Sequence, residues 1–162
     1  MQRIKVSVLF IFISSFLLGQ GTRSGLEQGK ATAAVLDFEG SGITTQEAQV
    51  LTQRLGSELV QTKALIMVER NQMSEIMDEQ GFQQSGCTSA ECAAEIGALL
   101  GVQKMITGSF GKLGNTYTIE ARMFAVESGQ TEKTVSKTYK GEVDGLLPQI
   151  QIVAWELVGL EP

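Results

Sequence analysis

Hydrophobic positions in the first half of the chain alternate between continuous runs and helical stripes. The apolar runs Ala33 to Phe38 and Ala64 to Val68 predict strands buried on both faces. Gly40-Ser41-Gly42 is expected to end the first strand. Thr44 and Glu47 then fit a capping box, and apolar residues at helical spacing from Ala48 to Leu59 predict a helix to about Thr62.

The sequence pattern in the second half of the chain predicts two helices, an antiparallel meander of three strands and a final helix. A short helix from Asn71, as N-cap, to about Gln80 precedes a second helix that ends at Gly101. The remaining expected elements are strands at Lys104 to Phe110, Thr116 to Ala125 and Thr131 to Lys140, and a helix from Asp144 to Val158. Pro148 falls in the first turn of that helix. The middle strand alternates apolar and polar residues, which predicts a sheet with one covered face and one solvated face.

These elements follow the order β-α-β-α-α-β-β-β-α. A βαβ opening implies parallel pairing with a right-handed crossover, and the meander adds antiparallel strands. The predicted fold class is α/β, with a single domain over residues 32–160 and a mixed five-stranded sheet packed by helices.

The N-terminus predicts export. Arg3 and Lys5 precede a short apolar run from Val6 to Leu18, which is shorter than the roughly 20 residues of a membrane span. We therefore expect residues 1–21 to be a signal peptide and residues 22–31 to be a flexible segment. A retained N-terminal anchor helix is the alternative. Since no cysteine lies near the expected cleavage site, no lipid anchor is expected there.

Composition narrows the expected chemistry. Removal of Arg3 and Lys5 with the leader would change the formal net charge from −5 to −7, which disfavours nucleic acid and anionic membranes as partners. The chain has no histidine, which excludes Ser-His-Asp and Cys-His nucleophiles and histidine metal sites. We expect no enzyme, no cofactor and no metal site.

Four carboxylates are candidates for a chemical role. Glu75, Asp78 and Glu79 could act as paired acids, but a charged outer helix face is the favoured interpretation. Asp37 lies inside an apolar run, where it could cap a neighbouring helix or bind a ligand. Capping is the favoured role.

The two cysteines flank a predicted helix start. Thr88-Ser89-Ala90-Glu91 fits a capping box with Thr88 as N-cap, which places Cys87 at N′ and Cys92 at N4. Those two positions touch in a hydrophobic staple, and an exported protein meets an oxidising compartment. A structural disulfide between Cys87 and Cys92 is therefore expected, with free buried thiols as the alternative.

Four blocks of the sequence resemble a known family. "AAVLDFEGSG", "ALIMVERNQMSEIMDEQGF", "AAEIGALLGVQKMITGSF" and "NTYTIEARMFAVESGQ" are similar to segments of the CsgG/HfaB family of curli and holdfast production-assembly proteins. The same fold occurs in the penicillin-binding-protein activator LpoB and in the N-terminal domain of TolB. The resemblance implies an exported, non-catalytic accessory protein of the Gram-negative envelope. The short hairpins and the missing acylatable cysteine depart from the family pattern and argue against a pore and against curli as cargo.

Two functions remain open from the sequence. The first is a periplasmic assembly or scaffold protein that binds envelope proteins or further copies of itself, with association with the outer membrane as an open expectation. Its expected contact surface is the edge strand Thr131 to Lys140, with Val135, Lys137 and Tyr139 as candidate residues. The alternative is a small-ligand or glycan-binding domain that uses a sheet face with Tyr117 and Arg122.

We predict that thiol labelling of the denatured, unreduced native protein modifies neither Cys87 nor Cys92. The double serine variant should fold and lose about 2 kcal/mol of unfolding free energy, because the bond closes a small loop. Two labelled thiols in protein purified from its own envelope would contradict the disulfide.

Overall fold

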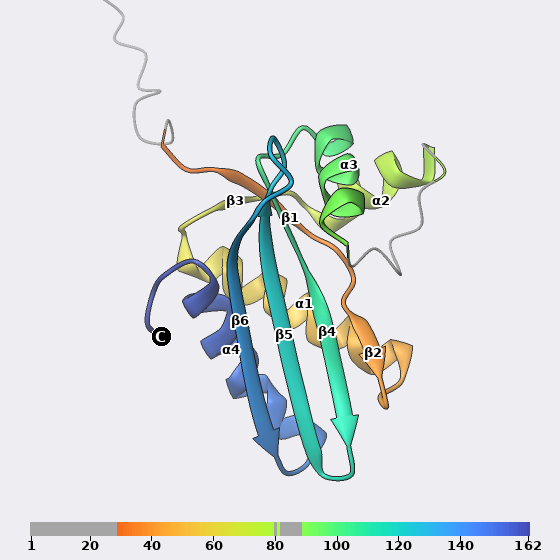
Figure 1. The fold of residues 1–162 in the computed structure, drawn as a ribbon, viewed down its shortest axis with the longest axis vertical. Helices are drawn as coiled ribbons and strands as arrows, with labels where there is room; N and C mark the ends of the chain where they lie inside the picture. The colour runs from red at the N-terminus through yellow and green to blue at the C-terminus, as the bar shows by residue number, and fades with distance from the viewer. Residues whose placement is uncertain (1–28, 80, 82–88) are drawn as a thin grey trace, which may run out of the picture.

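The computed structural model describes residues 29–79, 81 and 89–162, which form a mixed sheet and four α-helices (Figure 1). The expected signal peptide, most of the segment 22–31 and Cys87 lie outside the described residues. The strands are β1 (Thr32–Val35), β2 (Glu39–Ser41), β3 (Ile66–Met67), β4 (Lys104–Leu113), β5 (Thr116–Ala125) and β6 (Thr131–Lys140). The helices are α1 (Thr45–Thr62), α2 (Arg70–Glu79), α3 (Ala90–Leu100) and α4 (Leu146–Leu157), the last preceded by a 3₁₀ turn at Val143–Gly145.

The sheet follows the predicted topology with one added strand. Its order is β3-β1-β4-β5-β6, and β2 pairs with β4 beyond the end of β1. Strand β1 runs parallel to β3 and β4, and β4, β5 and β6 form an antiparallel meander. The mixed α/β sheet is therefore confirmed, although six strands replace the expected five.

The sixth strand, β2, lies just beyond the first predicted strand, Ala33 to Phe38, and was not predicted. The N–H of Phe38 leaves the ladder and donates instead to Thr52 Oγ1 of α1, at 3.2 Å. Pairing with β4 then resumes over Glu39–Ser41, at the Gly40-Ser41 step that was expected to end the strand. The hydroxyl of Thr52 in α1 thus binds the backbone at the break between β1 and β2.

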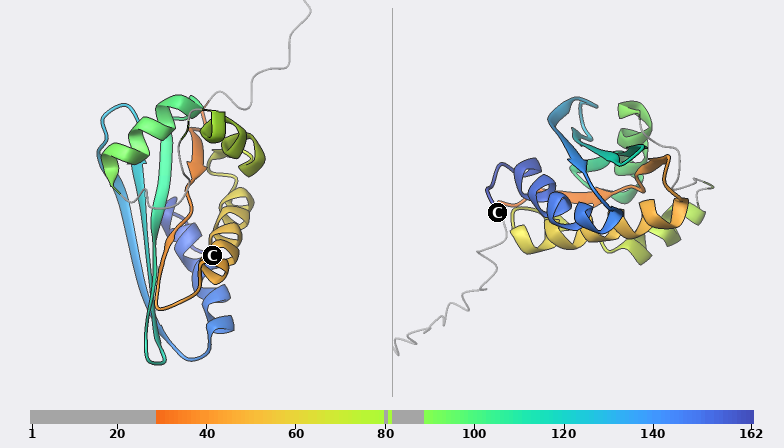
Figure 2. Two further views of the ribbon diagram at one scale, coloured as in Figure 1. Left: turned by 90° about the vertical axis from the view of Figure 1, so that its right-hand side faces the viewer. Right: turned by 90° about the horizontal axis from the view of Figure 1, so that it is seen from below.

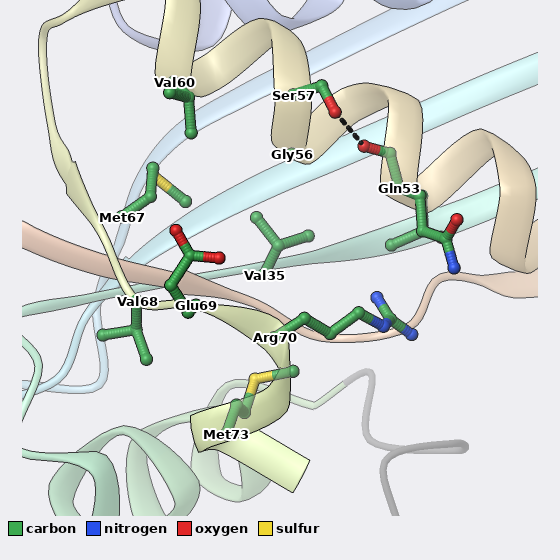
Figure 3. A pocket seen from close by; sticks show the side chains of 11 residues that line it. Val35, Gln53, Gly56, Ser57, Val60, Met67, Val68, Glu69, Arg70 and Met73 are labelled. Atoms are coloured by element: carbon green, nitrogen blue, oxygen red, sulfur yellow. Dashed lines mark hydrogen bonds between the residues drawn. The ribbon is translucent and has the colours of Figure 1, made fainter.

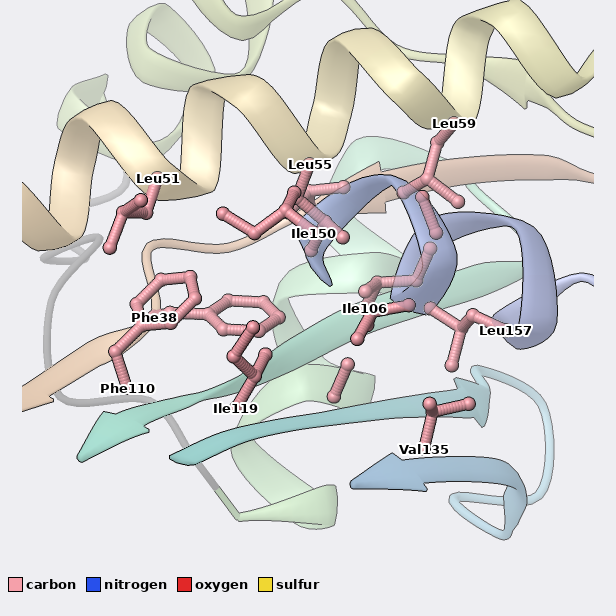
Figure 4. Packing of buried hydrophobic residues seen from close by; sticks show 14 of the residues in the cluster. Phe38, Leu51, Leu55, Leu59, Ile106, Phe110, Ile119, Val135, Ile150 and Leu157 are labelled. Atoms are coloured by element: carbon pink, nitrogen blue, oxygen red, sulfur yellow. The ribbon is translucent and has the colours of Figure 1, made fainter. Parts of the chain in front are cut away.

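Helix α1 begins as its sequence predicts. Thr44 Oγ1 accepts a hydrogen bond from the Glu47 N–H at 3.1 Å, and the Glu47 carboxylate accepts one from the Thr44 N–H at 2.7 Å. The stripe from Ala48 to Leu59 is buried. It packs with α4 against one face of the sheet, where Leu55 and Ile150 lie close together over Ile106 (Figure 4).

The opposite face of the sheet is covered at one end only. Met73 and Met77 of α2 and Ile96 of α3 pack there with Leu36, just after β1, and with Phe124 of β5. Figure 2 shows α3 across this end, while the strands extend beyond it. The predicted solvated face is therefore half covered, and its free part lies along β5 and β6.

Several predicted boundaries differ from the structure. Strand β3 has two paired residues and is half-buried, whereas a longer buried strand was expected. Helix α2 begins at Arg70, so Asn71 is inside the helix and is not its N-cap. Helix α4 begins at Leu146, with Pro148 in its first turn as expected. No helix among the described residues is both long enough and apolar enough to span a membrane.

Two glycines permit close packing within the family-like blocks. A Cβ on Gly108 would overlap the Glu120 carbonyl oxygen and lie 2.5 Å from Phe38 Cε2. A Cβ on Gly97, inside α3, would lie 2.6 Å from Met105 Cγ. The approach of β5 to β4, and of α3 to the sheet, therefore requires glycine at these positions.

We predict that Thr44→Ala lowers the unfolding free energy by about 1 kcal/mol at neutral pH, because an N-cap acceptor is lost. Hydrogen bonds from the backbone N–H and the hydroxyl of Thr44 lower the pKa of the Glu47 carboxyl below its ordinary value. The stability that these bonds contribute is therefore present above the ordinary pKa and is lost as the pH falls through the lowered pKa. Denaturant unfolding of both proteins between pH 7 and pH 2 should show the gap between them narrowing in acid, because the bond from the Thr44 hydroxyl to the Glu47 carboxylate weakens when the carboxylate is protonated. An equal gap at every pH would contradict this coupling.

Candidate functional site

Strand β6 occupies the expected edge of the sheet. Among the described elements it pairs with β5 alone, along nearly its whole length. Helix α4 packs against one face of the strand, as Figure 1 shows. The strand is thus covered on one face while its outer backbone edge has no strand partner in the described part of the chain.

The three residues predicted as contacts on this edge turn toward α4. Val135 is buried within the main core. Lys137 Nζ lies 2.7 Å from Glu156 Oε1 of α4. The Tyr139 ring packs beside Tyr117, with ring centroids 6.4 Å apart. These three side chains therefore attach the helix to the strand, and the interaction edge along β6 stays a prediction.

The backbone groups that face outward belong to the residues between them. The Gly141 N–H donates to the Asn115 carbonyl at 2.9 Å, which makes this a bonded pair next to the Thr116–Lys140 pair. Bonded and non-bonded pairs alternate along an antiparallel ladder, so the backbone groups of Val135, Lys137 and Tyr139 face β5. The N–H and C=O groups of the intervening residues consequently face outward. These residues are Thr134, Ser136 and Thr138, and their side chains are exposed.

The two residues proposed for a glycan-binding surface, Tyr117 and Arg122, lie on opposite faces of β5. Tyr117 is buried on the face that packs against α4. Arg122 lies at a position of opposite parity on β5 and pairs across with Thr134. Successive side chains of a strand point to opposite faces. Tyr117 and Arg122 therefore cannot line one binding surface.

Asp37 forms an ion pair instead of capping a helix. Its Oδ1 accepts from the Arg70 guanidinium, at the residue where α2 begins. Asp37 is buried and Arg70 is half-buried. This pair joins two of the sequence blocks that resemble the CsgG family.

The other candidate carboxylates, Glu75, Asp78 and Glu79, are exposed on α2. The described residues hold no group of three or more potential metal ligands.

The cap of α3 lies one residue later than predicted. Ser89 is the N-cap, and its Oγ accepts from the Cys92 N–H at 3.2 Å. Cys92 is therefore at N3, so the hydrophobic-staple geometry used to pair the cysteines is wrong. The disulfide with Cys87 remains a prediction because Cys87 lies outside the described residues.

A cavity that the sequence did not predict opens between α1 and α2. We call it the α1–α2 pocket; its volume is about 340 Å³. Its lining residues are Val35, Thr52, Gln53, Gly56, Ser57, Val60, Met67, Val68, Glu69, Arg70 and Met73. Figure 3 shows the Glu69 carboxylate and the Met73 side chain directed into it. Gly56, a glycine inside a predicted helix, is the one feature of the sequence that could have indicated this pocket.

The fold and the open edge define a small mixed α/β domain. The family described as curli production assembly/transport component CsgG matches residues 20–137. The chain belongs to this CsgG family. No curated protein matches the sequence.

Three solved structures show the same fold at low sequence identity. The LpoB C-terminal domain from Salmonella enterica has a TM-score of 0.56 and 17% identity, and the match covers 68% of this chain and 82% of that one. The PelC dodecamer from Paraburkholderia phytofirmans has a TM-score of 0.52 and 10% identity, with 82% and 90% covered. TolB from Acinetobacter baumannii has a TM-score of 0.52 and 8% identity, with 80% and 28% covered. The predicted likeness to LpoB and TolB is confirmed for the fold.

Proposed function

We propose that this protein is an exported, non-catalytic assembly or scaffold component of the bacterial cell envelope. Membership of the CsgG family, over residues 20–137, is the observation that carries the proposal. In this proposal the protein acts in the periplasm, in association with the outer membrane. The predicted signal peptide supports this location.

The outer edge of β6 supplies a means of assembly. An unpaired strand edge is a template for another chain, and main-chain hydrogen bonds then provide much of the affinity. The edge extends over ten residues and is held rigid by β5 and α4. We propose that a strand of an envelope partner, or of a second copy, pairs with Thr134, Ser136 and Thr138. The dodecamer formed by PelC supports self-assembly as one outcome of this fold.

We predict that Ser136→Pro abolishes this assembly and leaves the domain folded. Ser136 offers its N–H outward, so proline there removes a donor only from the free edge. The Ser136→Ala variant keeps the donor and serves as the matched control. Light scattering on complexes purified from the native envelope should show wild-type size for Ser136→Ala and a monomer for Ser136→Pro.

The Val135→Pro variant separates edge pairing from general damage. The Val135 N–H faces β5 and its side chain is buried, so this variant should lower the melting temperature by well over ten degrees. Circular dichroism should show Ser136→Pro close to wild type. Complexes of wild-type size from Ser136→Pro, or a wild type that is monomeric and without partner, would contradict the proposal.

A further inference from the structure

Helix α1 contains a glycine that no contact within the described residues explains. Gly56 lies in the interior of Thr45–Thr62, where glycine is the least favourable residue after proline. A Cβ at Gly56 would meet no atom within 4 Å, and its φ is not positive. The helical glycine of α3 is different, since Gly97 has Met105 and Val126 packed against it. The space above Gly56 is therefore open to an occupant from outside the chain.

Gly56 lines the α1–α2 pocket together with an apolar wall. Val35 and Met73 are buried at its base, and Met67 is half-buried beside them. Val60, at the outer rim, is 55% exposed. A site for a free small molecule normally encloses most of its ligand. Here the outer wall consists of exposed residues of α1, which suits a protein segment that covers the rim as it fills the base.

The charge of the pocket indicates the chemistry of that segment. Glu69 and Arg70 are the charged lining residues. Arg70 is paired with Asp37, whereas Glu69 has no ion pair among the described residues. The Glu69 carboxylate is directed into the pocket between Met67 and Val35 (Figure 3). An occupant with an apolar stem and a cationic end complements these groups.

We propose that the α1–α2 pocket receives a lysine side chain, flanked by aliphatic residues, from a partner protein. The methylene stem packs against Met67 and Val60, and the ammonium group pairs with Glu69. The flanking aliphatic residue lies over Gly56. The pocket borders β3, at the opposite end of the strand order from β6. The proposal shares with the proposed function only the assumption of a protein partner, so the two can fail separately.

Titration of the ¹⁵N-labelled protein with the peptide acetyl-Ala-Leu-Lys-Leu-Ala-amide tests this site. The amide resonances of Gly56, Ser57 and Glu69 should shift saturably. The same peptide with norleucine or glutamate in place of lysine should bind about two- to fivefold more weakly, the range expected of an exposed ion pair. Pentylamine should bind far more weakly than the lysine peptide, because it lacks the flanking aliphatic residues.

Two variants and their controls isolate the contributions of space and charge. Gly56→Leu should fill the pocket and weaken peptide binding at least tenfold, while Gln61→Leu, on an exposed site of the same helix, should not. Glu69→Lys should reverse the preference, so that the glutamate peptide binds better than the lysine peptide. Glu75→Lys, outside the pocket on α2, should leave the preference unchanged.

Three results would overturn the proposal. These are equal affinity of wild type for the lysine and glutamate peptides, shifts that avoid Gly56 and Glu69, and pentylamine binding as tight as that of the lysine peptide. The last would assign the pocket to a small amine. None of them affects the Ser136→Pro experiment, since that variant acts at the other edge of the sheet.

Discussion

The register of the antiparallel ladder between β5 and β6 determines how this protein can meet another chain. Ala121 lies opposite Val135, and Ile119 lies opposite Lys137. This register turns the buried side chains of Ile119, Ala121 and Val135 toward α4. It leaves the exposed hydroxyl side chains of β6, Thr134, Ser136 and Thr138, on the other face. A shift by one residue would exchange the two faces and expose Val135, so burial of the core fixes the register. The same register leaves the backbone groups of Thr134, Ser136 and Thr138 on the outer edge.

The remaining elements hold this ladder in place. Gly108 permits β5 to approach β4, and the Thr52 hydroxyl redirects the chain between β1 and β2 so that Phe38 packs on Phe110, with ring centroids 5.1 Å apart. On the other side, the Asp37–Arg70 pair fixes the start of α2 beside β1. That start forms one wall of the α1–α2 pocket. The contacts that build the fold therefore also create the two surfaces proposed for partners.

The sequence predicted the elements whose cause is local. Periodicity located α1, α3, α4 and the three meander strands, and the Thr44–Glu47 capping box is present. The errors have non-local causes. The division between β1 and β2 depends on Thr52, fourteen residues from Phe38 in sequence. The orientation of Val135, Lys137 and Tyr139 depends on which face α4 covers. The α1–α2 pocket combines residues from four elements, β1, α1, β3 and α2, so no single stretch of sequence indicates it.

Amide hydrogen exchange along β6 tests the central claim most directly, because it reads the direction of each N–H group. In the isolated protein, the amides of Val135, Lys137 and Tyr139 should exchange slowly, and those of Thr134, Ser136 and Thr138 should exchange fast. In complexes purified from the envelope, the second set should become as slow as the first. Fast exchange of Val135, or an outer set that stays fast in the complex, would contradict assembly through this edge.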